Sequence, residues 1–234
     1  MRFLICLIAM TLLHGELPAV AATIRFRTLC LRHQAEVRQV FAAGPDGNNL
    51  QSVPLFTVQS SPATMHTTDG NAVFVLPDGL MPDGKPRYKT VASAKVSGAG
   101  EFLFLFVPAG KDAVQPYKVV TLPDDSHAFP YGNLLLLNLA GVAVRFHLGE
   151  SSGERAITLN PGTKKMVERV RQVDAFNMYN VVIESRTGDR FIPFSSTRWK
   201  SVEGRRDLVI IYLDPLTGKP LVNLYNDAEL SAPP

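Results

Sequence analysis

The pentapeptide GESSG at residues 149–153 is the part of the sequence whose spacing most directly suggests catalysis. It fits the G-x-S-x-G pattern of a nucleophile elbow, in which a strand enters a tight turn, a serine sits at its apex and a helix leaves it. Here the β-branched Ile157 and a Pro-Gly pair follow the turn, which is typical of a hairpin. The last histidine of the chain, His147, precedes Ser151, so no histidine follows that could act as its base. We interpret the match as chance and predict a non-enzymatic protein.

A second candidate for chemistry is the polar cluster Asp124, Asp125 and His127 in the sequence PDDSHAFP. A carboxylate beside an imidazole could orient it for proton transfer, which would suit a hydrolase with dispersed catalytic residues. The alternative is a loop whose aspartates cap their own backbone amides. No histidine has another histidine or a cysteine two or four residues away, so the spacing indicates no zinc site. We predict no catalytic residue, no metal and no cofactor.

Aromatic side chains gather in the sequence DRFIPFSSTRWKSV, which contains Phe191, Phe194 and the single tryptophan, Trp199. Exposed on a sheet, these rings could stack against sugars, whereas buried rings would fill the space between two sheets. The sequence leaves both interpretations open. Phe191, Phe194 and Trp199 are therefore candidate ligand-binding residues, and a carbohydrate-binding module is the alternative function.

The N-terminus has the order of a cleaved secretory signal. Arg2 precedes an apolar run over residues 3–13, and Ala19-Val20-Ala21 supplies the small residues of a cleavage site, so we predict cleavage after Ala21. The run is shorter than the roughly 20 residues needed to cross a bilayer, and we expect no transmembrane anchor after cleavage. Only Cys30 would then remain, as a buried small residue or as a reactive thiol. Lack of a disulfide in an exported chain favours a bacterial periplasmic or secreted location.

Composition narrows the class of partner. The net charge of +3 is too small to indicate nucleic-acid binding. With 46% hydrophobic and 19% charged residues, the chain has the composition of a globular protein.

Short apolar or alternating segments, separated by Gly, Pro, Asn and Asp clusters, run through most of the chain and predict an all-β fold. In strand number and spacing the pattern resembles immunoglobulin-like domains, and we predict two antiparallel β-sandwiches, with a single elaborated sandwich as the alternative. The candidate strands are residues 24–31, 37–42, 53–58, 72–76, 88–96, 101–107, 117–122, 133–140, 142–148, 155–159, 180–185, 190–193, 197–202, 207–213 and 221–226.

The domain boundaries follow from the turns. We expect a signal peptide at 1–21, a first sandwich at 22–122, a linker at 123–132, a second sandwich at 133–228 and a disordered tail at 229–234. Residues 164–176 place Met166, Val170, Val173 and Phe176 at helical spacing, so a short helix there is as well supported as a strand. Residues 31–44 are similarly ambiguous.

These patterns together predict an exported binding or assembly protein of the bacterial cell envelope. Its expected partner is another envelope or extracellular protein, with a glycan as the alternative. The segment KPLVNLYND is a candidate edge strand, because Lys219 and Pro220 are residues that protect a sheet edge from aggregation. An edge strand can accept a strand from another chain through backbone hydrogen bonds.

Overall fold

The computed structural model describes residues 22–34, 36–44, 49–67, 69–110, 112–149, 156–214 and 217–228. The signal peptide and C-terminal tail expected from the sequence lie outside these residues. Within them the fold is all-β, as the sequence predicted, and it contains no helix. The described residues accordingly include no helix long and apolar enough to cross a membrane.

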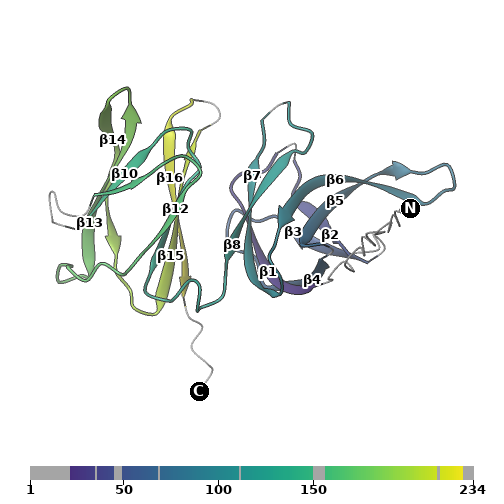
Figure 1. Ribbon diagram of the computed structural model, residues 1–234, viewed down its shortest axis with the longest axis horizontal. Coiled ribbons are helices and arrows are strands. Elements are labelled where there is room, and N and C mark those ends of the chain that lie inside the picture. The colour runs from purple at the N-terminus through teal and green to yellow at the C-terminus, as the bar shows by residue number, and fades with distance from the viewer. Residues whose placement is uncertain are drawn as a thin grey trace, which may run out of the picture.

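The described residues form two halves of eight strands each, which lie side by side in Figure 1. The N-terminal half contains β1 (Ala22–Cys30), β2 (Gln39–Ala43), β3 (Leu50–Pro54), β4 (Ala63–Thr67), β5 (Asn71–Leu80), β6 (Pro86–Lys95), β7 (Gly100–Pro108) and β8 (Tyr117–Pro123). The C-terminal half contains β9 (Leu134–Asn138), β10 (Val144–Leu148), β11 (Ile157–Leu159), β12 (Lys164–Val167), β13 (Met178–Thr187), β14 (Arg190–Lys200), β15 (Arg205–Leu213) and β16 (Pro220–Ala228).

The two halves have the same strand order. In the N-terminal half, sheet 1 is β4-β1-β7-β8 and sheet 2 is β3-β2-β5-β6. Adding eight to each strand number gives the C-terminal half, where sheet 3 is β12-β9-β15-β16 and sheet 4 is β11-β10-β13-β14. The one parallel pair in each half also corresponds, since β1 pairs with β7 and β9 pairs with β15. The fold is therefore an internal structural repeat, although the sequence shows no corresponding residue-level repeat.

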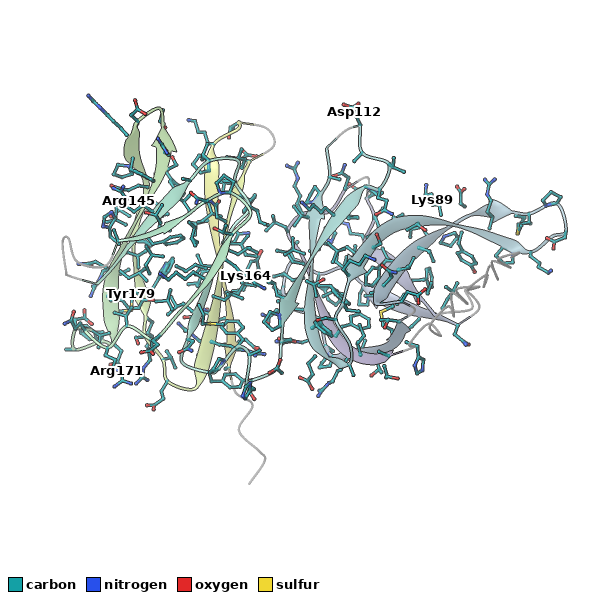
Figure 2. The ribbon with its side chains drawn as sticks, in the orientation of Figure 1. Lys89, Asp112, Arg145, Lys164, Arg171 and Tyr179 are labelled. Carbon is teal, nitrogen blue, oxygen red and sulfur yellow. The ribbon has the colours of Figure 1, made fainter. Side chains whose placement is uncertain are left out.

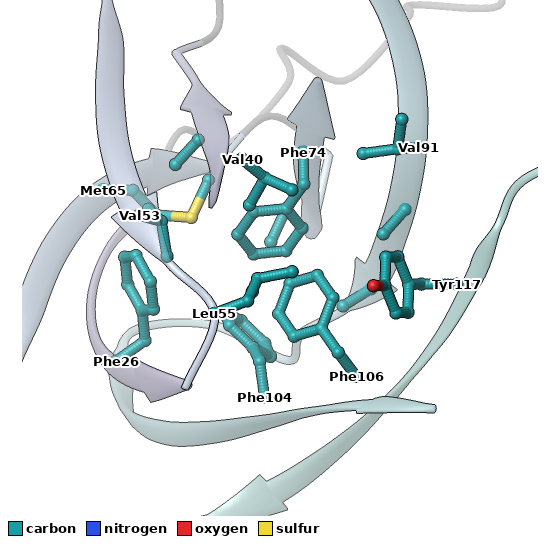
Figure 3. Packing of buried hydrophobic residues seen from close by; sticks show 14 of the residues in the cluster. Phe26, Val40, Val53, Leu55, Met65, Phe74, Val91, Phe104, Phe106 and Tyr117 are labelled. Carbon is teal, nitrogen blue, oxygen red and sulfur yellow. The ribbon is translucent and has the colours of Figure 1, made fainter. Parts of the chain in front are cut away.

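Three apolar clusters hold the four sheets together. The N-terminal core lies between sheets 1 and 2, and Figure 3 shows its aromatic centre, which includes Phe26, Phe74, Phe104 and Phe106. The C-terminal core lies between sheets 3 and 4. A third group, here called the shared cluster, joins the outer faces of sheets 1 and 3 and includes Leu29, Leu105, Leu137 and Ile210.

The alternation of side chains along a strand explains how sheet 1 and sheet 3 each contribute residues to two apolar clusters. Side chains alternate between the faces of a strand. In β7, Phe104 and Phe106 enter the N-terminal core while Leu103 and Leu105 enter the shared cluster. All five residues of β9 are buried for the same reason, so its sequence LLLLN has no polar alternation. The continuous apolar run thus marks a strand that is covered on both faces.

The helix considered for residues 164–176 is wrong, because the structure has strand β12 followed by an irregular segment there. β12 pairs with β9, and alternation sends Met166 to the shared cluster and Val167 to the C-terminal core. Val170 and Val173 pack against the C-terminal core from an irregular segment, and Phe176 is 76% exposed. The apolar residues therefore do not share one face, as a helix would require. Residues 31–44 likewise contain a strand, β2, and no helix.

Candidate functional site

The predicted polar cluster separates into two parts, and Asp124 belongs to an ion network between the halves. Arg27 on β1 donates two hydrogen bonds of 2.6 Å to the carboxylate of Asp124 and bonds of 3.2 and 2.7 Å to Asp227 on β16. Arg206 on β15 donates to Asp124 at 2.9 Å and to Asp227 at 2.8 Å. Two arginines and two aspartates thus form a closed ring with balanced charge.

The ring is largely buried, although its four residues border a cavity of about 340 Å³. The side chains of Arg206 and Asp124 are 4% and 9% exposed, and Arg206 lies 5.0 Å from the ring centroids of both Phe129 and Tyr131. Arg206 also donates a 3.0 Å hydrogen bond to the carbonyl of Phe129. Buried pairs of this kind are costly to break, because removal of one partner leaves the other charge unpaired. Residues 124–131, which the sequence suggested as a linker, are therefore fixed against the C-terminal half.

The rest of the predicted cluster caps the backbone. The carboxylate of Asp125 accepts hydrogen bonds from the amides of His127 at 3.0 Å and Ala128 at 2.7 Å. The His127 side chain is exposed. Among the described residues, no group of three or more histidine, cysteine, aspartate and glutamate side chains could hold a metal ion. Asp124, Asp125 and His127 do not converge on one point.

The candidate aromatic residues also lie in different environments. Trp199 is 7% exposed and packs edge-on against Tyr179, with ring centroids 6.3 Å apart, in the C-terminal core. Phe194 is half-buried against the same core. Phe191 lies under Arg145, whose guanidinium carbon is 3.7 Å from the ring centroid. Trp199 is thus a core residue, and the three rings form no common platform for a sugar.

Two strands flank the G-x-S-x-G sequence. β10 precedes it, and β11 follows and pairs with β10 in antiparallel fashion, with Phe146 opposite Ile157. Ser151 itself lies outside the described residues. The structure therefore has a strand where a nucleophile elbow would have a helix.

Cys30 is fully buried in the N-terminal core. Burial raises the pKa of its thiol to about 11, because the thiolate would lose its hydration. A thiol is reactive as the thiolate, so this environment suppresses its reactivity. Cys30 is a packing residue in this conformation.

The segment predicted as an edge strand does lie at a sheet edge. β16 pairs with β15 and is the last strand of sheet 3. The backbone of Arg205, Asp207 and Ile211 bonds toward the β9 side, through Gly132, Asn133 and Leu139. Backbone groups alternate along a strand, so Leu208 and Ile210 bond to β16, where they face Tyr225 and Asn223. The N–H and C=O groups of Val222, Leu224 and Asn226 then point away from sheet 3.

The ion ring fixes one end of this edge. Asp227 is the residue of β16 that Arg27 and Arg206 hold, and Asn226 donates a 2.7 Å hydrogen bond to Asp207. Burial would raise the pKa of Asp227, but the hydrogen bonds from Arg27 and Arg206 outweigh it and hold the pKa below its ordinary value. The ion ring and the Asn226–Asp207 hydrogen bond therefore fix the C-terminal part of β16 against its neighbours.

Sequence reasoning missed three of the four ring residues. Arg27 is separated from Asp124 by 97 positions and from Asp227 by 200. The only local signal was the pair of arginines that alternate with apolar residues in IRFRTLC. An alternating strand pattern places such arginines on the surface of one sandwich, and nothing in it reveals that a second sandwich covers that surface.

Comparison with known proteins shows no family. No family model matches the chain, and no curated protein matches it. Among solved structures, a leucine-rich repeat protein from Bacteroides thetaiotaomicron VPI-5482 is similar at 11% sequence identity, with a TM-score of 0.18. The similarity covers 81% of this chain and 25% of that protein, so the chain spans about a quarter of its length.

Proposed function

We propose that this chain is an exported, non-enzymatic binding or assembly protein of the bacterial cell envelope, with each half an immunoglobulin-like domain. The repeated order of two four-stranded sheets, antiparallel apart from the pairs β1–β7 and β9–β15, supports the domain assignment, since such domains pack two largely antiparallel sheets around one core. The N-terminal leader sequence supports export. Detection of a mature chain that begins at Ala22 in the envelope fraction tests the export step.

The observation that supports binding is the free edge of β16. The strand spans nine residues, Pro220–Ala228, and has a neighbour in sheet 3 on one side only. A partner protein would add an extended segment beside it, using the outward backbone groups of Val222, Leu224 and Asn226. The ring at Asp227 holds this edge in place, so the partner does not have to order it. Pro220 at the start limits pairing to the middle and end of the strand.

The experiment compares Val222→Pro with Val222→Ala in the full chain. Proline removes the outward N–H of residue 222 but leaves the hydrogen bonds between β15 and β16, so the fold should survive. Both variants lose the half-buried valine side chain, so alanine controls for packing. Affinity capture from solubilised envelope is then quantified for each variant. We expect proteins captured by wild type and Val222→Ala to fall by about tenfold or more with Val222→Pro.

Equal capture by Val222→Pro and Val222→Ala would contradict binding at this edge. Circular dichroism of both variants checks that the strand content is unchanged. The carbohydrate alternative required an exposed aromatic platform, and the burial of Trp199 gives it no support.

A further inference from the structure

The two halves differ in the length of the connection between their fourth and fifth strands. In the N-terminal half, residues 68–70 connect β4 to β5. In the C-terminal half, residues 168–177 connect β12 to β13. Most connections in compact domains are as short as the strands allow, and a longer loop on one copy of a repeat is a common location of function.

The additional segment borders three hollows of the surface. Cavities of about 570, 530 and 320 Å³ are each lined by residues from the range 168–174. The largest, here called the β11–β12 groove, lies where the edge strand of sheet 4 meets the edge strand of sheet 3. Segment 168–172 forms part of the wall of this groove. Figure 2 labels Arg171, which lies at the lower left of the view.

The groove has an apolar lining that packing leaves incompletely covered. Leu148 and Ile157 contribute from the β10–β11 side, and Val167 and Val170 contribute from β12 and the added segment. All four side chains contact the C-terminal core, yet each is only half-buried. The groove therefore offers apolar area that a ligand could remove from water.

The charged residues around this lining are predominantly basic. Lys165, Arg169 and Arg171 line the groove together with one acidic residue, Glu168. Arg169 lies 3.4 Å from Glu203, whose side chain is 89% exposed. Lys165 and Arg171 are exposed at the groove. A ligand of complementary charge would carry carboxylates.

We propose that the β11–β12 groove binds an extended segment of a partner protein in which apolar residues alternate with aspartate or glutamate. An extended peptide directs successive side chains to opposite sides, so its apolar residues would face the apolar lining and its carboxylates would lie at the rim of the groove. Lys165 and Arg171 are exposed and have long side chains, which can reach carboxylates at the rim. β11 and β12 are each the terminal strand of their sheet, so the segment could add to one of these two edges through backbone hydrogen bonds. The inference rests on the proposed binding function but uses a different edge from β16.

The test begins with a phage-displayed library of short random peptides selected against the full chain. We expect the selected sequences to alternate apolar with acidic residues. Fluorescence anisotropy of labelled peptides should then show affinity about tenfold or more weaker for the double variant Lys165→Glu/Arg171→Glu. The matched control is Lys89→Glu/Lys118→Glu, which changes the net charge equally in the N-terminal half, where Figure 2 shows Lys89. Added salt should weaken wild-type binding.

Failure to select any peptide, selection without acidic residues, or equal affinity in both double variants would overturn the proposal. Val222→Pro distinguishes the two sites. Peptides that lose affinity with Val222→Pro and not with Lys165→Glu/Arg171→Glu would locate binding at β16, which supports the proposed function and overturns the groove. Peptides with the opposite response, together with envelope capture unaffected by Val222→Pro, would support the groove and contradict the β16 edge.

Discussion

The two halves have the same strand order but differ in the residues that form their cores. The N-terminal core is built around phenylalanines, with Phe74 lying 4.9 Å from Phe106 and 5.6 Å from Phe104 between ring centroids. Among the described residues the C-terminal core is largely aliphatic, and its buried aromatic residues are Phe146, Tyr179 and Trp199. The same strand order therefore accommodates two cores of different composition.

The connections teach a second lesson from the same comparison. Loops do not have to be the same length for the sheets to form, since residues 68–70 and 168–177 join equivalent strands. The shorter connection is tightly packed, because a Cβ atom at position 70 would lie only 2.7 Å from the carbonyl oxygen of Val96. A side chain larger than that of Gly70 would therefore clash there. The longer one carries Arg169 and Arg171 along a groove. The longer connection therefore adds surface to the C-terminal half, where we propose that the groove binds a partner.

The largest expected effect comes from Phe104→Ala, which tests whether the halves unfold together. Removal of this fully buried ring should lower the free energy of unfolding by about 4 kcal/mol. Trp199 fluorescence reports the C-terminal half and labelling of Cys30 reports the N-terminal half. Because the shared cluster joins them, we expect both transitions in urea to shift together. A shift in Cys30 labelling alone would mean that the halves unfold separately.

The next effect tests the ion ring as the connection between the halves. Arg206→Ala should lower the free energy of unfolding by about 3 kcal/mol, because Asp124 and Asp227 lose a buried partner. We expect the Trp199 and Cys30 transitions to separate in this variant. Arg25→Ala removes an exposed ion pair with Glu101 and should change stability by about 0.5 kcal/mol or less. Similar losses in both variants would show that the ring contributes little.

The smallest effect is a pH dependence centred on Asp227. The pKa of this carboxyl is lower in the folded chain than its unfolded value of about 3.9, so its stabilising contribution is complete above that value. The contribution is lost as pH falls through the folded pKa. Urea denaturation from pH 7 to pH 3 should show a shallower loss of stability in Asp227→Asn than in wild type. The control Glu101→Gln, at an exposed pair, should follow the wild-type curve.

The sequence predicted the class of fold and most strands, because alternation and turn residues are local signals. It missed β4, where the buried residues of ATMHT are Met65 and Thr67 and only one of them is apolar. It divided β14 at Phe194, where a bulge opposite Ile183 and Glu184 interrupts the alternation without ending the strand. It also gave Met166 and Val170 a common face, because it could not show that β12 is covered on two sides.

For the candidate site, the sequence located β16 but not the residues that hold it. Arg27, Arg206 and Asp227 come from strands far apart in the chain, and their charges have no local spacing that relates them. The groove has no local signal either. Acidic Glu168 and Asp174 are interleaved with Lys165 and Arg171 in the sequence, and only the strand order puts this segment between two sheet edges. Local pattern predicts which residues are in strands, and only the pairing of distant strands determines which of their surfaces meet.

The shared cluster has a mechanical consequence. Leu29, Leu105, Leu137 and Ile210 join the two sandwiches by an apolar contact instead of a free tether. A force applied to β16 in the C-terminal half would be transmitted through sheets 3 and 1 to the N-terminal half. No flexible linker would have to extend first. We therefore expect the two sandwiches to keep a constant separation when the molecule is under load.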